Sequence, residues 1–181
     1  MKTEPFGTAQ LAKIIGRNPR FVFDWVERGL IFADIKAAAG PGTQMEFSYA
    51  AVLRAYLALY FQTKYGFSRK KLKGLMESLW GSHFFHDWEQ GFPEDRSINA
   101  LFKGLEELQR GFPIEPQGGC LFIFNPYEDK SKVIFWSSSL AVALLLWEEE
   151  SARKFFEGVH DVIALNLYDL KKVVDEQIAE L

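Results

Sequence analysis

The chain has 181 residues, of which 48% are hydrophobic, and a net charge of −3, which together suit one good core or two small ones. The N-terminal MKTEPFG has no apolar signal region, and the longest apolar run, LAVALLLW at 140–147, is well below the roughly 18 residues that a membrane span needs. We therefore expect a soluble cytoplasmic protein with no membrane partner.

The charges are distributed unevenly along the chain. Residues 1–78 contain twelve Lys and Arg against six Asp and Glu, a net charge of +6, whereas residues 79–181 contain nine against eighteen, a net charge of −9. A basic first half joined to an acidic second half favours a nucleic-acid partner. Two oppositely charged domains that attract each other would give the same totals, so this alternative stays open.

Two short helices are predicted near the N-terminus. TAQLAKIIG at 8–16 is amphipathic and ends at a glycine, and GRNPRFVFDWVERGL at 16–30 follows it directly. The residues that mark the start and end of the second helix are Asn18, Pro19 and Gly29. The residues on its inner stripe are Val22, Trp25 and Val26. A helix, a tight turn and a second helix within about 22 residues have the spacing of a helix-turn-helix.

A hairpin and two longer helices are predicted next. In 30–48, two apolar or alternating arms flank AAAGPG, which breaks any helix and predicts a β-hairpin wing. Ser48 then caps a helix through Tyr65, and Ser68 caps another that runs to 79. The expected inner residues of the first are Val52, Leu53, Tyr56, Leu57 and Tyr60. Those of the second are Leu72, Leu75, Met76 and Leu79.

The rest of the chain divides into two regions that differ in composition and in predicted secondary structure. Residues 80–118 form an aromatic-rich connector with one amphipathic helix at 97–111. From 119 onward, GCLFIFNP and KVIFWSS predict a hairpin with largely buried faces, 138–158 one or two helices, and HDVIALNL a further strand. The last helix covers 168–181. Its apolar stripe consists of Leu170, Val173, Val174, Ile178 and Leu181.

The order of motifs in the first half resembles the winged-helix DNA-binding domain of MerR-family transcription regulators over about residues 6–79. The resemblance rests on LAKIIGRNPRFVFDWVERGLI, a glycine-bearing wing that ends in Phe-Ser, and LRAYLALYFQTKYGFSRKKLKGLM. The resemblance implies an N-terminal MerR-like winged helix-turn-helix, and the strand and helix patterns of 119–181 predict a small C-terminal α+β domain. We therefore expect an α+β, mainly α fold. The expected domains are 1–79 for DNA binding, 80–118 as a connector, and 119–181 for dimerisation or sensing.

The helix-turn-helix places basic residues where they can meet phosphates. Lys13, Arg17 and Arg20 cluster at the turn and the start of the second helix, and Lys36 and Arg54 would extend that footprint. A solvated basic surface is the alternative. The full set of candidate DNA-binding residues is Lys13, Arg17, Asn18, Arg20, Phe21, Asp24, Lys36, Gln44 and Arg54.

The second helix and the wing depart from the family pattern. Where the family commonly has Pro-Arg-Thr-Leu-Arg-Tyr-Tyr, this chain has Phe23 for the second arginine and Asp24 for the first tyrosine. The wing has Gln44, Met45 and Glu46 before Phe47-Ser48, where the family tends to have arginine. Fewer phosphate contacts predict weaker DNA binding and a shallower salt dependence.

Three residues of the second helix, Phe21, Phe23 and Asp24, differ in whether they are expected to contact DNA bases or to pack within the chain. Phe21 can contact a thymine methyl group or pack internally, and both alternatives stay open. Asp24 can accept a hydrogen bond from cytosine N4. For Phe23 we expect packing against the second half of the chain.

Other chemistry has little support. His83 and His86, with Asp87 and Glu89, have metal-ligand side chains, but the aromatic residues around them favour packing or an interface. The cysteine, Cys120, excludes an intramolecular disulfide and lies among residues that favour burial over reactivity. Ser137–Ser139 lie in no nucleophile motif, and Glu148–Glu150 fit a solvated helix face. We expect no enzyme, no metal and no cofactor.

The sequence therefore predicts a sequence-specific, MerR-type transcription regulator that binds double-stranded DNA as a homodimer. The alternative is a winged-helix protein-interaction module that has lost specific DNA reading. Dimerisation is expected through the helix at 97–111 or the last helix, since "GFPEDR" interrupts any long pairing helix soon after residue 79. Whether a small-molecule or protein effector acts through residues 80–181 stays open.

Overall fold

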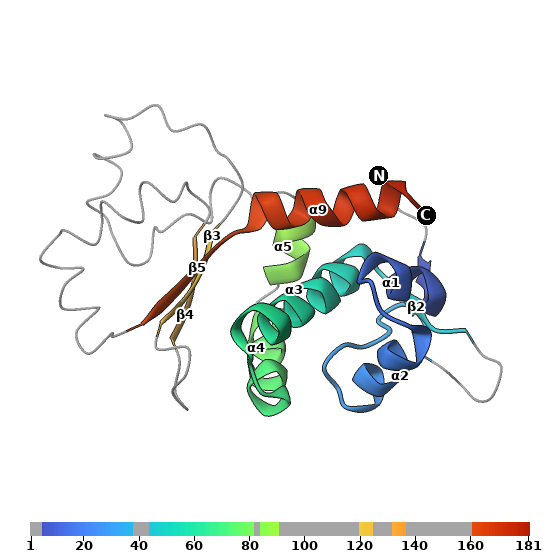
Figure 1. Cartoon of the computed structure of the whole chain (residues 1–181), viewed down its shortest axis with the longest axis horizontal. Helices are drawn as coiled ribbons and strands as arrows, with labels where there is room; N and C mark the ends of the chain where they lie inside the picture. Colours follow the sequence, from blue (N-terminus) through green and yellow to red (C-terminus); the bar gives the residue numbers. More distant parts are fainter. Residues whose placement is uncertain (1–4, 38–43, 82–83, 91–119, 125–131, 137–160) are drawn as a thin grey trace, which may run out of the picture. The chain divides into compact units, whose positions relative to one another are not determined.

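The computed structural model describes residues 5–37, 44–81, 84–90, 120–124, 132–136 and 161–181 (Figure 1). The described chain is mainly helical, with small antiparallel sheets, as the predicted α+β, mainly α class requires. It divides into two compact units, one formed by Met1–Glu89 with Lys171–Leu181 and the other by Gln90–Leu170. Within the described ranges, no helix combines the length and the apolarity needed to cross a membrane.

The predicted helix-turn-helix helices are confirmed. Helix α1 covers Thr8–Ile14 and helix α2 covers Pro19–Glu27. The Asn18 side chain accepts a hydrogen bond from the Phe21 N–H at 2.9 Å, and proline occupies the first helical position of α2. Gly29, just after α2, has a φ of 68°, a left-handed conformation that glycine adopts without steric cost. Local capping chemistry therefore sets both ends of α2.

The wing is closed at its base. Glu46 and Lys36 form an antiparallel bridge, with the Glu46 N–H donating to the Lys36 carbonyl at 3.0 Å and the Lys36 N–H donating back at 3.3 Å. The tip at 38–43 lies outside the described residues. The sequence did not predict that strand β2, Glu46–Phe47, also pairs antiparallel with strand β1, Phe6–Gly7.

Helix α3, Tyr49–Tyr65, is the centre of the first unit. The Ser48 hydroxyl accepts a hydrogen bond from the Ala51 N–H at 3.1 Å, as its predicted capping role requires. The expected single inner stripe is too narrow, because residues on every side of α3 are buried, whereas Tyr56 and Tyr60 are only partly buried. Helices α1, α4 and α9 lie around α3 in Figure 1, which explains this broad burial.

Helix α4, Arg69–Gly81, follows a left-handed Gly66 and buries its predicted inner residues. Those residues are Leu72, Leu75, Met76 and Leu79. Helix α5, Phe84–Gln90, lies in the predicted connector, in a stretch to which the sequence analysis assigned no element. It buries Phe85 and Trp88, each 1% exposed, and residues up to Glu89 belong to the first unit.

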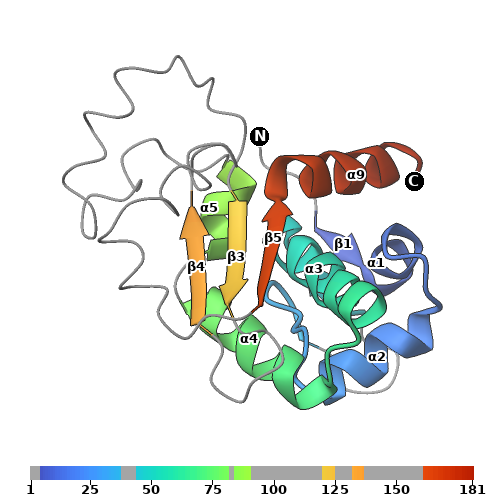
Figure 2. The same ribbon diagram turned by 60° about the vertical axis from the view of Figure 1, so that its left-hand side comes forward.

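The second unit contains an antiparallel sheet with strand order β4-β3-β5 (Figure 2). Strands β3 (Cys120–Phe124) and β4 (Lys132–Trp136) form the predicted antiparallel pair, and β5 (Val162–Asn166) pairs with the other edge of β3. The buried residues of one sheet face lie directly opposite each other in the β3–β5 register. These pairs are Leu121–Leu165 and Ile123–Ile163.

Helix α9, Leu167–Ala179, follows β5 without a linker, and the Asn166 side chain caps it by accepting from the Tyr168 N–H at 3.0 Å. Its residues from Lys171 onward belong to the first unit. There the Tyr49 hydroxyl donates a hydrogen bond to the Asp175 carboxylate, and Val174 is fully buried.

The predicted apolar stripe of α9 is therefore only partly correct. Val174 and Leu170 are buried within the chain itself, whereas Val173 is 38% exposed and Leu181 is 44% exposed. The stripe is therefore not exposed along its whole length, as a surface for a partner subunit would be.

Several predicted features lie outside the described residues. They are the helix at 97–111, the helices within 138–158, the turn between β3 and β4, His83, Ser137–Ser139 and Glu148–Glu150.

Candidate nucleic-acid interface

The N-terminal end of α2 exposes two arginines. Arg17 and Arg20 are both solvent-exposed, and the Arg17 guanidinium lies over the Phe21 ring at 5.7 Å from its centroid. Phe21 in turn packs on the buried Trp25 ring, with 4.6 Å between centroids. The positive dipole end of a helix N-terminus adds to these side chains as a setting for an anion.

Asp24 joins α2 to α4 through ion pairs. One carboxylate oxygen lies 2.6 Å from Arg28 Nε, and the other lies 3.9 Å from Nη2 of Arg69 at the start of α4. Lys73 lies close to the end of α2, because a Cβ placed on Gly29 would be 3.5 Å from its Nζ. The C-terminal end of α2 and the first turns of α4 therefore form one charged surface.

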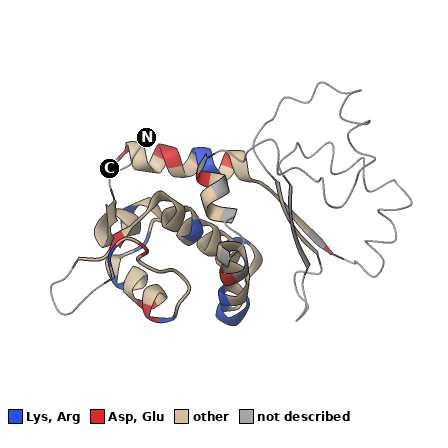
Figure 3. Cartoon of the chain, turned by 180° about the vertical axis from the view of Figure 1, so that it is seen from behind, with Lys and Arg blue, Asp and Glu red and all other residues tan. Residues whose placement is uncertain are grey.

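This surface contains basic residues that the sequence analysis did not single out. We call the exposed arginines and lysines of α2 and the start of α4 the α2–α4 basic surface: Arg17, Arg20, Arg28, Arg69, Lys70 and Lys73. In Figure 3 basic residues gather at one end of α4. The run Ser-Arg-Lys-Lys at 68–71 could have indicated these residues from the sequence. Ser68 caps the predicted helix, and the three basic residues that follow lie in its first turn.

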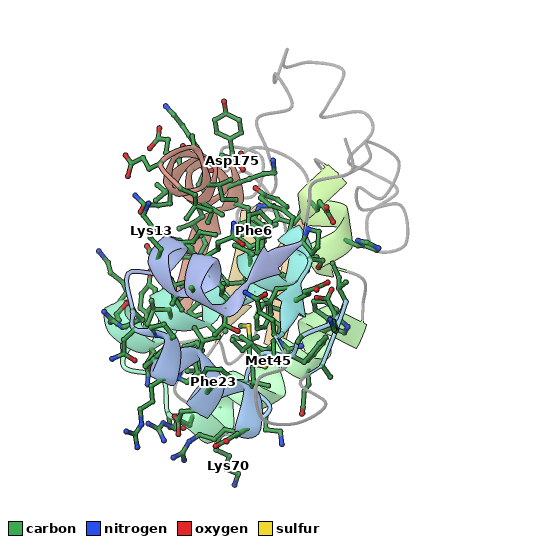
Figure 4. All side chains as sticks on the ribbon, turned by 90° about the vertical axis from the view of Figure 1, so that its right-hand side faces the viewer. Phe6, Lys13, Phe23, Met45, Lys70 and Asp175 are labelled. Carbon is green, nitrogen blue, oxygen red and sulfur yellow. The ribbon has the colours of Figure 1, made fainter. Side chains whose placement is uncertain are left out.

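Most of the second half of the chain, against which Phe23 was predicted to pack, lies outside the described residues, and Phe23 itself is exposed rather than buried. Its side chain is 44% exposed, while Val22 and Trp25 on the opposite stripe are fully buried. Figure 4 shows Lys70 at one end of the first unit and Asp175 at the other, with Phe23 between them and nearer to Lys70. The helical period accounts for this exposure, because residue 23 lies away from the stripe that contains 22 and 25.

Arg54 is not available to DNA, which corrects its place among the candidates. The whole residue is buried, and its Nε donates a hydrogen bond to the Leu30 carbonyl at 2.9 Å. Its guanidinium lies 4.1 Å from the centroid of the Phe32 ring and 5.4 Å from that of Trp80. Burial lowers the pKa of Arg54 to about 10, which still leaves the side chain charged at neutral pH.

Lys13 is exposed but already has a partner within the chain. Its Nζ donates a hydrogen bond to the Glu180 carbonyl at 2.7 Å, at the end of α9. In Figure 4 Lys13 lies on the same side of the unit as Asp175. A lysine at a helix C-terminus is stabilised by the negative end of the helix dipole. The structure therefore directs Lys13 toward α9 rather than toward the α2–α4 basic surface.

The wing candidates are also partly engaged. Lys36 Nζ lies 3.8 Å from the Glu46 carboxylate, across the base of the wing. Gln44 is exposed, and its side-chain amide would lie 3.2 Å from a Cβ placed on Gly7, which puts it beside β1. Met45 is 2% exposed and belongs to the core, so its side chain is not available to a partner at the surface. The wing base therefore carries little unpaired positive charge.

The histidine cluster is described only in part. His86 Nδ1 lies 3.3 Å from the Glu89 carboxylate on the exposed side of α5. Phe85 and Trp88 face the core, where Phe85 packs 5.8 Å from Trp80 between ring centroids. Among the residues that the structure describes, no three His, Cys, Asp or Glu side chains lie together as metal ligands would.

Comparisons with known proteins add no assignment. No protein-family model matches the chain, and no curated protein matches it either.

Proposed function

We propose that this chain is a sequence-specific DNA-binding transcription regulator of MerR type, which acts as a homodimer on double-stranded DNA. The observation that carries the proposal is the capped helix α2, which exposes Arg17 and Arg20 at its N-terminus directly after the turn from α1. A second group of cations, Arg28 and Arg69, lies at its other end. A helix with cations at both ends fits a major groove, where phosphates line both edges.

The order of elements supports the same proposal. A wing closed by Lys36 and Glu46 follows the helix-turn-helix, and two helices capped by Ser48 and Ser68 follow the wing. This is the order on which the resemblance to MerR-family domains rests. The departures at Phe23 and Asp24 reduce the net positive charge of the reading helix, so we expect modest affinity and strong dependence on the remaining arginines.

Dimerisation belongs to the proposal because a two-fold dimer presents two reading helices to two half-sites. The buried residues of α9, such as Val174, are used within the first unit. We therefore assign pairing to residues 90–170, which include the amphipathic sequence at 97–111. An effector that acts through this part of the chain would alter the spacing of the two reading helices.

A protein-interaction module is the second candidate. The exposed Phe23 favours it, since an aromatic side chain at the centre of a helix face is typical of protein-binding surfaces. The ion-paired Asp24 favours it as well, because it neutralises part of the basic surface.

The test is selection of bound duplexes by the full chain from a random pool at about 100 mM salt, where specific contacts outlast phosphate contacts alone. The proposal predicts enrichment of an inverted repeat whose half-sites lie one or two helical turns apart. Enrichment of no sequence would favour the protein-interaction module. Sedimentation of the same sample at micromolar concentration tests the dimer, and a monomer would exclude the two-fold arrangement.

A further inference from the structure

We propose that Phe23 is the specificity-determining residue of α2 and that it reads the C5 methyl group of thymine in the major groove. This inference rests on the proposed function and adds the chemical group that is recognised. The sequence left Phe21 open between a thymine contact and packing and predicted packing for Phe23, whereas in the structure Phe21 packs on Trp25 and Phe23 is 44% exposed.

Phe23 lies on the outward face of α2. Positions 20, 23 and 27 follow the i, i+3, i+7 spacing of one helical stripe, and Val22 and Trp25 on the opposite side are fully buried. Arg20 and Glu27, its neighbours on that stripe, are exposed as well. Any molecule that contacts the middle of this face therefore meets the Phe23 ring.

Two polar candidates, Asp24 in α2 and Asn18 at its N-cap, are already engaged. Both oxygens of Asp24 face arginines, Arg28 at 2.6 Å and Arg69 at 3.9 Å, so this carboxylate has partners other than a base. The Asn18 carbonyl oxygen accepts from the Phe21 N–H as the helix cap. The remaining residue with a large exposed surface in the middle of the helix is apolar.

The cations on both sides of Phe23 favour DNA over an uncharged partner for this surface. Arg17 and Arg20 lie at the start of α2, and Arg28 and Arg69 lie at its end. Cations at both ends match the two phosphate rows that border a major groove. Between those rows, the thymine methyl is the apolar group that the four standard bases present, and an aromatic side chain contacts it without needing a hydrogen bond.

The experiment removes only that methyl group. Each thymine of a duplex selected by the wild-type full chain is replaced in turn by deoxyuridine, and affinity is measured by fluorescence anisotropy. We expect one thymine position in each half-site at which the replacement weakens binding about fourfold, the factor that corresponds to burying one methyl group. Phe23→Ala should bind the thymine and uracil duplexes equally, while Phe23→Leu should keep part of the difference.

Val173→Ala is the matched control, because it also removes an exposed apolar side chain, from α9, and should keep the wild-type difference. Circular dichroism of each variant reports folding. The inference is overturned if Phe23→Ala keeps the uracil sensitivity, or if no thymine position is sensitive in the wild type. In both cases duplex binding itself would persist, which separates them from failure of the proposed function, where the wild type binds no duplex and both proposals fall.

Discussion

The carboxylate of Asp24 lies 2.6 Å from Nε of Arg28, one turn further along α2. This ion pair explains an acidic side chain in the middle of a helix that otherwise exposes arginines. Asp24 also faces Arg69 at 3.9 Å, so it connects α2 to α4 and holds two cations in place. It lowers the net charge of the α2–α4 basic surface while fixing where its cations lie. Because both arginines are at least half exposed, the pairs contribute little to stability.

Asp24→Asn should therefore strengthen binding to duplex DNA. Removing the carboxylate leaves Arg28 and Arg69 without their acidic partner, so both can face phosphate. We expect affinity at about 50 mM salt to rise roughly threefold to tenfold and the salt dependence to steepen by about one unit of slope. Glu176→Gln on α9 removes one negative charge from another exposed helix and should change neither quantity. Equal effects of the two variants would mean that only net charge matters.

Arg54 should matter for stability and not for DNA binding. Arg54→Ala removes a buried side chain whose guanidinium lies over the Phe32 and Trp80 rings and leaves a cavity, whereas Arg54→Met fills much of that volume. We expect Ala to lower the free energy of unfolding by about 2 kcal/mol more than Met does, as measured by urea denaturation. In anisotropy, the folded Arg54→Met protein should keep the wild-type salt slope. A shallower slope would place its guanidinium at a phosphate.

The Tyr49 hydroxyl should stabilise the attachment of α9 to the first unit. Tyr49→Phe keeps the ring, over which Lys171 Nζ lies 5.3 Å from the centroid, and removes the donor to Asp175. We expect a loss of about 1–2 kcal/mol in the free energy of unfolding. Tyr168→Phe is the matched control, because that ring is 55% exposed, and it should cost nothing measurable. Equal stability of Tyr49→Phe and wild type would show that this hydrogen bond adds nothing.

Alkaline pH should weaken the same contact. Burial and the neighbouring Asp175 raise the pKa of Tyr49 above its ordinary value of about 10. Above that pH the unfolded chain releases the phenol proton while the folded chain retains it, so the free energy of unfolding falls as pH rises. Below about pH 10 the contribution is fully present. Urea denaturation between pH 9 and about 11 should show a stability difference between wild type and Tyr49→Phe that narrows only above pH 10.

The sequence predicted those helices whose ends are set by capping residues or glycines close by in the chain. Asn18 and Ser48 cap α2 and α3 as expected, and Gly29 takes the left-handed conformation after α2. These signals depend on a few adjacent residues. By contrast, β1 is two residues long and has no alternation to detect, so its pairing with β2 could not be anticipated.

The candidate site was predicted less completely, because exposure depends on neighbours that are distant in sequence. Arg54 has the pattern of a surface residue, yet α3 is surrounded by other helices and the residue is fully buried. The sequence predicted that Phe23 packs against the second half of the chain, yet its side chain is 44% exposed. Arg69 joins the site through Asp24, and this contact depends on how α2 packs near α4.

The arginines at the start of α2 should bind DNA phosphates. The most direct measurement is fluorescence anisotropy of the full chain with a labelled duplex over a salt series from about 50 mM, comparing wild type with the Arg17→Ala, Arg20→Ala double variant. The wild type should bind with clear salt dependence, and the double variant should bind every sequence more weakly, with a slope shallower by about one to two units. Absence of wild-type binding to any duplex at the lowest salt, or an unchanged slope in the double variant, would contradict it.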